Sequence, residues 1–177
     1  MTILRAFWAD DRGSLTVEFV LWVPVLLIWL MASIAWFDAW LARNQAAKVA
    51  YTVSDILSRQ EEVTGGFLMQ IDTLQRGLLT RADGAAAMRL SSIQRTSTGH
   101  EVRWSCSNAP SLQPLTDGNL PTADLPDMAT LETIVLTELA VPWSGFDWAV
   151  GLGALTWTYR VPSRPRFTPM LAMIDDC

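Results

Sequence analysis

The feature that most constrains this chain is an apolar run of 26 residues (40 − 15 + 1) near the N-terminus, from Leu15 to Trp40. Only Glu18 and Asp38 are charged within it. A helix of about 20 apolar residues spans the hydrocarbon core of a bilayer. A run that is apolar on every side also exceeds what so small a domain can bury. The sequence therefore predicts a single transmembrane helix over about residues 15–40.

The helical pattern continues beyond this apolar run. Positions on one helix face recur at steps of four and three from Ala42 to Gln60, and polar residues occupy the opposite face. Thr64, Gly65 and Gly66 interrupt the pattern. We therefore expect one long helix over residues 14–62, with its first half in lipid and its second half amphipathic.

The remainder, residues 63–177, has the pattern of a small folded domain. Helical spacing indicates a second helix from Phe67 to about Thr80. Alternation of period two then predicts strands at 88–98, 102–106, 133–141 and 155–161. Within 102–106, Val102, Trp104 and Cys106 are expected on the same buried face. The expected fold class is α+β, with a long helix, a second helix and a small antiparallel sheet.

Composition and charge exclude several functions. The formal net charge is −5, and Lys48 is the only lysine, which argues against a nucleic-acid partner. His100 is the only histidine, so neither a metal site nor a histidine-based catalytic set is expected, and no cofactor motif is present. The sequence favours an interaction protein over an enzyme.

The segment Asp11 to Phe19 has an unusual combination of residues at the start of the predicted membrane helix. Gly13 lies at the expected water–lipid boundary, and Glu18 is a lone carboxylate inside the apolar run. A carboxylate in hydrocarbon is costly and generally functional. No basic residue nearby in the sequence is placed to neutralise it.

This segment resembles the N-terminus of type IV pilin precursors, in which a prepilin peptidase cuts after glycine. The resemblance implies a leader of residues 1–13, cleavage between Gly13 and Ser14, and Glu18 as the fifth residue of the mature chain. In that family the fifth-position glutamate meets the free amine of a neighbouring subunit's first residue. Two charges that are each costly in lipid are tolerated as a pair, so Glu18 would set subunit register.

The resemblance is narrower than pilins in general. Residues 13–24 are similar to the TadE-like proteins of tight-adherence pilus systems, as are residues 53–61 and 158–166. A minor pilin or pseudopilin is thereby implied, with prepilin peptidase, other pilin and pseudopilin subunits and the pilus assembly platform as partners. Localisation would be the inner membrane, with the C-terminal domain in the periplasm and access to a surface pilus. The leader departs from the family in being net neutral, and the basic residues flanking the apolar run do not by themselves fix its orientation.

Four residues of the apolar run are candidates for helix packing. Trp22, Trp29 and Trp36 repeat every seven residues and share a helix face. Two interpretations stay open, packing against other pilin helices or contact with lipid and its interfacial belt. Pro24 removes a backbone donor inside the helix, so a kink or local unwinding is expected there.

The two cysteines, Cys106 and Cys177, both follow the apolar run and so lie in the same compartment. In an oxidising periplasm we expect them to pair.

An alternative of a different class is a soluble secreted domain released by ordinary signal peptidase. Ser33, Ile34 and Ala35 form a small-x-small site, and the preceding run would serve as the hydrophobic region. That run is longer than the usual 7 to 15 residues, by about five or more. Sequencing of the mature N-terminus separates the two hypotheses, because it would begin at Ser14 or at Trp36.

Overall fold

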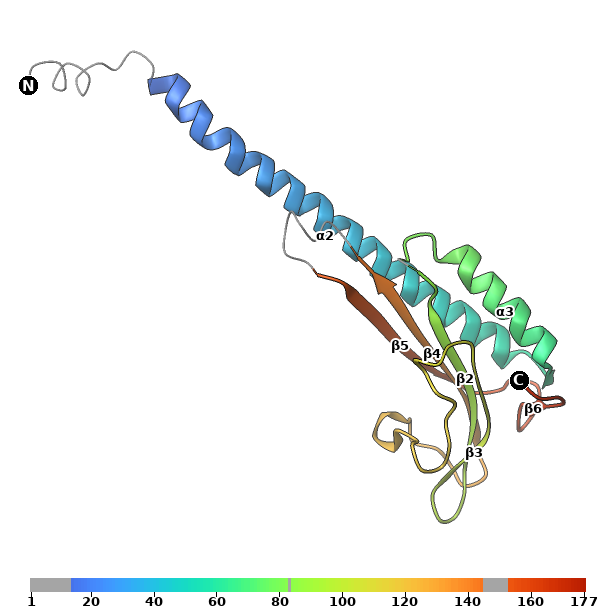
Figure 1. Ribbon diagram of the computed structural model, residues 1–177. Helices are drawn as coiled ribbons and strands as arrows, with labels where there is room; N and C mark the ends of the chain where they lie inside the picture. The colour runs from blue at the N-terminus through green and yellow to red at the C-terminus, as the bar shows by residue number, and fades with distance from the viewer. Residues whose placement is uncertain (1–13, 83, 145–152) are drawn as a thin grey trace, which may run out of the picture.

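One long helix, α2, organises the structure, a computed structural model that describes residues 14–82, 84–144 and 153–177. Helix α2 runs from Ser14 to Ser58 over 45 residues. A second helix, α3 (Gly65–Leu78), and a four-stranded sheet lie against its C-terminal half, whereas its N-terminal half projects away from them (Figure 1). The predicted α+β class is confirmed.

The main sheet is antiparallel throughout and has the order β3-β2-β4-β5. Its strands are β2 (Ala87–Arg95), β3 (His100–Ser107), β4 (Thr133–Trp143) and β5 (Leu155–Ser163). A short parallel pair joins β1 (Glu62–Val63) to β6 (Ala172–Met173), and one 3-10 turn, η1, covers Thr122–Asp124. The four strands expected from the period-two pattern are thus present, with ends that differ by a few residues.

The core lies between the helices and one face of the sheet. Alternate residues of β2 and β4 point toward α2, because side chains alternate between the two faces of a strand. The buried residues of this core include Ala46, Val49, Val53 and Leu57 from α2, and Leu90, Val135, Leu139 and Val141 from the sheet. Small side chains along α2 allow the helix to approach the sheet closely, so the second half of α2 belongs to the folded domain.

Helix α2 ends at Ser58, four residues before the expected end at residue 62. The difference comes from the C-terminal tail. The backbone nitrogen of Arg166 donates to the Ser58 carbonyl at 2.8 Å, which satisfies an acceptor at the end of the helix. Glu62 and Val63 then pair with β6 instead of continuing the helix.

The glycines at positions 65 and 66 are the first residues of α3, so the second helix begins two residues before its expected start at Phe67. Thr64 is the N-cap, and its hydroxyl accepts from the backbone nitrogen of Phe67 at 3.2 Å. A threonine cap supplies the start signal that the glycines obscure.

The expected common face of Val102 and Trp104 was also wrong. Ser92 pairs with Trp104, but the next residue of β2, Ile93, pairs with Val102, so Arg103 is an extra residue in β3. Such a bulge turns the residues on its two sides to opposite faces of the sheet. Trp104 accordingly packs with the helix-side core, whereas Val102 packs on the outer face.

The outer face of the sheet is covered by the long connection between β3 and β4, which includes η1 (Figure 1). Leu115 of this connection is buried against Ile93, Ile134 and Leu136 of the sheet. The connection therefore gives the sheet a second, smaller apolar layer, and both faces of β2 and β4 are buried.

Candidate functional site

The N-terminal part of α2 is the most unusual surface of the structure. From Leu15 to Ile34 its side chains are exposed or half-buried, and almost all are apolar. In the part of the chain that the structure describes, this is the one helix long and apolar enough to cross a membrane. Its 20 residues (34 − 15 + 1) cover about 30 Å at 1.5 Å per residue, the thickness of a hydrocarbon core.

Glu18 lies in the second turn of this exposed segment. Among the described residues its carboxylate has neither a hydrogen-bond nor an ion-pair partner. Gly13, the other half of the expected processing motif, lies outside the described residues, as does the rest of the leader. Ser14 is the first residue of α2.

The helix-packing candidates all lie on α2. Trp22, Trp29 and Trp36 are 58%, 68% and 64% exposed. The helix runs through Pro24 without interruption, so the local unwinding expected there does not occur. Proline at this position removes one backbone donor, yet a helix of this length tolerates the loss.

The junction between the exposed segment and the domain is built around Asp38. Its carboxylate forms an ion pair with Arg81, which follows α3, and accepts from the indole nitrogen of Trp143 at 3.1 Å. Trp143 is the last residue of β4 and is 2% exposed against Ala39 and Ala42. Asp38 is therefore a partnered residue at the boundary of the folded domain.

Two further contacts hold the helix at this level. The hydroxyl of Tyr159 donates to the backbone carbonyl of Arg43 at 3.0 Å. The Arg43 guanidinium lies 6.0 Å from the centroid of the Trp157 ring, within the range of a cation–π contact. Both aromatic residues come from β5. The domain therefore contacts this part of α2 through β4, β5 and the residues that follow α3.

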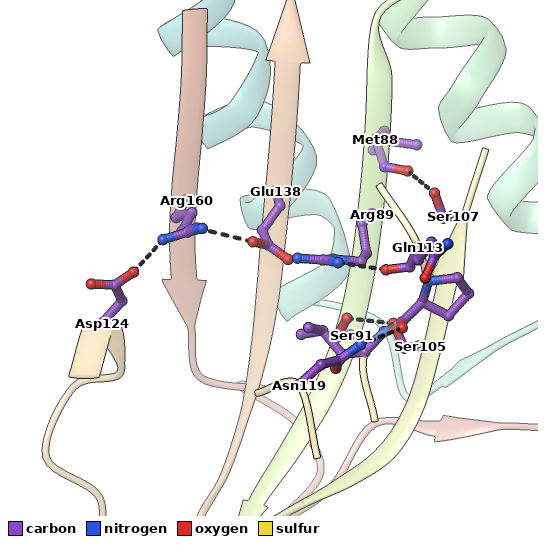
Figure 2. Close-up of polar contacts among 12 residues, drawn as sticks. Met88, Arg89, Ser91, Ser105, Ser107, Gln113, Asn119, Asp124, Glu138 and Arg160 are labelled. Carbon is purple, nitrogen blue, oxygen red and sulfur yellow. Dashed lines mark hydrogen bonds and ion pairs between the residues drawn. The ribbon is translucent and has the colours of Figure 1, made fainter. Parts of the chain in front are cut away.

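The outer face of the sheet contains a chain of charged groups (Figure 2). Glu138 on β4 is 2% exposed and lies between Arg89 on β2 and Arg160 on β5. Its Oε1 is 3.0 Å from Nε of Arg160, and Arg160 also pairs with Asp124 in η1. Arg89 donates to the carbonyl of Gln113. This chain fastens the long β3–β4 connection to the sheet at two points.

The C-terminal tail crosses the end of the domain that is farthest from the exposed helix (Figure 1). Leu171 is fully buried, and its carbonyl accepts from the indole nitrogen of Trp104 at 2.8 Å. The two cysteines, Cys106 on β3 and Cys177 in the tail, form a disulfide with their Cα atoms 5.7 Å apart. The tail is therefore attached to the sheet both covalently and through its buried leucine.

The tail also meets the start of α3. The Asp175 carboxylate accepts from the backbone nitrogen of Gly65 at 2.6 Å, where the positive end of the helix dipole favours an anion. A Cβ atom on Gly65 would lie 2.7 Å from the carbonyl oxygen of Asp176. Glycine is required at this position because the tail approaches so closely.

Sequence reasoning did not find the junction at Asp38 or the buried position of Glu138. An acidic residue at the end of an apolar run signals a partner, and this signal was present for Asp38. Its partners, Arg81 and Trp143, are 43 and 105 residues away in the sequence. Glu138 lies in a strand pattern otherwise rich in β-branched residues, and nothing local distinguishes it from a solvated charge.

An exposed apolar helix of membrane length that continues into a small α+β domain indicates an N-terminal membrane anchor. The comparison with protein families is more specific. Residues 13–55 match the family described as TadE-like protein, which confirms the resemblance drawn from the sequence and indicates a pilus-associated protein. The matched range (55 − 13 + 1 = 43 residues) covers the exposed segment and most of the part of α2 that packs against the domain, residues 35–58. No curated protein and no solved structure matches the chain.

Proposed function

We propose that this protein is a minor pilin or pseudopilin of a tight-adherence pilus system that acts through subunit contacts and not by catalysis. The observation that carries the proposal is Glu18, which has no partner among the described residues. It lies four residues after Ser14 on an exposed apolar helix, within the segment that matches the TadE-like family. Prepilin peptidase would remove residues 1–13, and the protein would then act in pilus biogenesis and adhesion.

In this proposal the anchor is shorter than the apolar run. The exposed residues 15–34 span the inner membrane once, and the domain begins near Ala35, which is fully buried. Asp38 would then lie at the periplasmic surface with its partners, and Trp36 and Trp40 would lie in the interfacial belt. Residues from here to Cys177 would be periplasmic, where the Cys106–Cys177 disulfide is stable.

Glu18 would set subunit register. Ser14 would carry a free amine after processing, and the corresponding amine of a neighbouring subunit would pair with the Glu18 carboxylate. Each charge alone is costly in lipid, so the pair forms at one relative position of the two helices. The pilus assembly platform and other pilin and pseudopilin subunits are the expected partners.

The alternative, a soluble domain released by signal peptidase after Ala35, has less support. Helix α2 continues without a break through Ser33, Ile34 and Ala35, and the family match extends across them. A cut there would separate the segment that carries Glu18 from the domain. We therefore retain the pilin proposal.

The test of processing is the N-terminus of the mature chain isolated from its own host. We expect a chain that begins at Ser14, and a Gly13→Leu variant that is not shortened, because a bulky side chain obstructs the peptidase cleft. A mature chain that begins at Trp36 would establish the secreted alternative. A Gly13→Leu chain of normal mature length would remove the basis of the pilin proposal.

The test of assembly uses Glu18→Leu in the same host. Removal of a carboxylate from hydrocarbon should leave membrane insertion intact or improved, because an acidic residue costs up to about 3 kcal/mol at a helix centre. Processing should persist and pilus assembly should fall. Normal piliation with normal processing would eliminate the register role of Glu18. A reporter that is active only in the periplasm, fused after Cys177, tests the topology in parallel.

A further inference from the structure

The two edges of the main sheet are protected to different extents. Strand β3 forms one edge and β5 the other (Figure 1). At the β3 edge the Asp117 carboxylate accepts from the backbone nitrogen of Val102 at 2.7 Å, and the sulfur of Cys177 lies 3.6 Å from the carbonyl oxygen of Ser105. The extra residue Arg103 also makes a bulge there. Bulges, charged side chains and covering segments are the means by which proteins block pairing at a sheet edge.

Strand β5 has no comparable protection within the described residues. Its pairing with β4 contains no bulge over its whole length. Arg160 is the one charged residue of β5, and Glu138 and Asp124 already bind its guanidinium. Proline occurs only near the C-terminal end of the strand, at Pro162. The sheet therefore has one blocked edge and one open edge.

The direction of the backbone groups at the open edge follows from the hydrogen bonds of the sheet. Arg95 of β2 donates to the Glu132 carbonyl at 2.9 Å and accepts from the Leu131 nitrogen at 2.7 Å, so its backbone bonds toward β4. Successive residues of a strand bond to opposite sides. The odd-numbered residues of β2 therefore bond to β4, and their partners on β4 are even-numbered. The odd-numbered residues of β4 remain for β5, where their partners are also odd-numbered. The even-numbered residues of β5 thus direct their N–H and C=O groups away from the sheet.

These outward residues form a row of free backbone groups. Thr156, Thr158 and Arg160 each present a donor and an acceptor, and Pro162 presents an acceptor alone. All four residues are exposed, and no described residue bonds to their outward backbone groups. The groups repeat every two residues, about 7 Å, which is the spacing of the matching row in another extended strand. The ligand that complements this edge is therefore a strand.

An antiparallel second copy does not fit this edge. β5 begins opposite Trp143, which binds Asp38 near the anchor. It ends at Ser163, whose hydroxyl donates to the Ser54 carbonyl at 3.4 Å, about four turns further along α2. β5 therefore runs away from the anchor, and an antiparallel second β5 would send its anchor in the opposite direction. This step rests on the proposed function, in which both anchors lie in one membrane.

A parallel second copy meets a different obstacle. Under two-fold symmetry, residues of the same number in the two β5 strands lie opposite each other. The slanted bonds of a parallel ladder join each bonding residue to the neighbours of the residue opposite it. In β5 those neighbours are the odd-numbered residues, which already bond to β4. A shift by one residue would restore the bonds but remove the symmetry that homodimers generally have. Head-to-tail pairing of copies is prevented by the blocked β3 edge.

We infer that β5 accepts an extended segment of a different polypeptide, which adds to the sheet as a fifth, antiparallel strand. Antiparallel pairing continues the arrangement of the sheet and is slightly more stable per residue. On the side of α2, the added strand places apolar side chains beside Trp157 and Tyr159, which are half-buried there. On the outer side it places β-branched or polar side chains beside Thr156 and Thr158. Backbone bonds supply the affinity of such an added strand, and its alternate side chains supply the selectivity.

The experiment is site-specific photo-crosslinking of the full chain in its own host. Benzoylphenylalanine replaces Thr156, Thr158 or Pro162 on the open edge, or Arg103 on the blocked edge, and mass spectrometry maps the adduct sites. The diagnostic result is the order of these sites. Because antiparallel strands run in opposite directions, the adduct site should move toward the N-terminus of the partner by about six residues between probe positions 156 and 162. Position 103 should give no such series.

Two variants at one position test the role of the backbone. Thr158→Pro removes an outward donor and leaves the bonds to β4 intact, whereas Thr158→Ala removes only the side chain. Loss of one backbone bond, about 1 kcal/mol, should lower the position-156 adduct by about fivefold or more in the proline variant alone. Thermal unfolding checks that both variants fold. Should the proline variant not fold, Thr156→Lys with Thr158→Lys, which guards the edge by charge, should lower the position-162 adduct instead.

Adduct sites without a constant step, equal effects of the two Thr158 variants, or adducts with a second copy alone would each overturn the inference. In the purified chain, the amides of Thr156 and Thr158 should exchange faster than those of Trp157 and Tyr159, and the reverse order would remove the outward row.

The N-terminus of the mature chain is sequenced in the same strains. Loss of the ordered series in a chain that begins at Ser14 would overturn the added strand and leave the proposed function standing. An ordered series in a chain that does not begin at Ser14 would overturn the proposed function and retain the added strand.

Discussion

The indole nitrogen of Trp143 donates to the carboxylate of Asp38 at 3.1 Å, across 105 residues of sequence. This bond and the ion pair between Asp38 and Arg81 attach α2 to the end of the domain that is nearest the exposed segment. They occur one turn beyond the exposed segment, where a change from lipid to water is proposed. The junction therefore depends on a residue that the hydropathy pattern alone would place inside the membrane.

Asp38→Ala should loosen this junction. It removes both the ion pair and the acceptor for Trp143, whereas Asp38→Asn keeps an acceptor and loses only the charge. We expect the alanine variant to lose about 1–2 kcal/mol and the asparagine variant about half of that, because the ion pair is partly exposed. Hydrogen exchange of residues 36–46 in the detergent-solubilised chain measures the effect. Asp127→Ala, an exposed site, is the control, and equal exchange in all three variants would contradict the account.

Glu138 should be the most sensitive charged residue of the domain. It is buried between Arg89 and Arg160, and its removal leaves Arg89, whose side chain is itself 11% exposed, without its carboxylate partner. Loss of one member of a buried pair costs about 3–5 kcal/mol. Urea unfolding of Glu138→Ala should show a loss of this size, and the β3–β4 connection should become sensitive to protease.

The matched control for this prediction is Glu101→Ala, which breaks the exposed pair with Arg103. An exposed pair contributes at most about 1 kcal/mol. Similar losses for Glu101→Ala and Glu138→Ala would show that burial does not determine the effect.

Two glycines of α3 should respond to alanine with opposite signs. At Gly65 the new Cβ would meet the carbonyl oxygen of Asp176 at 2.7 Å, so the tail must move, at a cost of about 1–3 kcal/mol. At Gly77 the new Cβ would meet no atom within 4 Å other than those of its chain neighbours and the surrounding helix backbone, and alanine should stabilise the helix by about 0.5–1 kcal/mol. Thermal unfolding of the two variants under identical conditions is the measurement. A stabilised Gly65→Ala chain would be incompatible with the tail position described above.

The Cys106–Cys177 disulfide should contribute substantially to stability. It closes a loop of 72 residues (177 − 106 + 1), for which chain entropy predicts about 4 kcal/mol. Urea unfolding of Cys177→Ser and of the double serine variant should give the same loss, because either change opens the same loop. Alkylation of the non-reduced protein isolated from its host checks that the bond forms in cells, and two reactive thiols would refute it.

Asp72 should make the domain sensitive to acid. Burial raises the pKa of this carboxyl, but hydrogen bonds from Asn108, Arg76 and Gln75 outweigh that effect and hold its pKa below the ordinary value of 3.8. A lowered pKa in the folded state means that the unfolded chain binds the proton more readily. The stabilisation is therefore complete above about pH 5 and declines as the pH falls through 3.8 and below.

Asp72→Asn tests this dependence. The variant should be less stable than the wild type at neutral pH. The difference should shrink at about pH 3, because below 3.8 the unfolded wild-type chain binds the proton more readily than the folded one. Denaturant unfolding at both pH values gives the comparison. A difference that does not change with pH would assign the effect to packing and not to charge.

The sequence pattern predicted elements whose residues repeat at a regular period. The long helix, the second helix and four strands follow from spacing of 3.6 and 2. Errors arose where distant segments intervene. Glu62 leaves the helical pattern because β6 pairs with it, and Val102 turns outward because one extra residue, Arg103, enters β3. A single sequence has no local signal for either event.

The residues of the candidate site also differ in whether the sequence could predict them. Glu18 and the tryptophans are recognisable because their type conflicts with an apolar helix or repeats along it. The partners of Asp38 are not recognisable, because Arg81 and Trp143 reach it only after the sheet and α3 have folded onto α2. Side chains that conflict with their local environment can be found from sequence, but the contacts that resolve the conflict cannot.

The uninterrupted course of α2 has a mechanical consequence. A single helix runs without interruption from the exposed segment into the part that packs against the domain, residues 35–58. Pulling on the segment before Ala35 therefore moves the folded domain by the same distance, and a twist of one turns the other through the same angle. Because the helix is continuous, a force applied to the exposed segment is transmitted directly to the sheet.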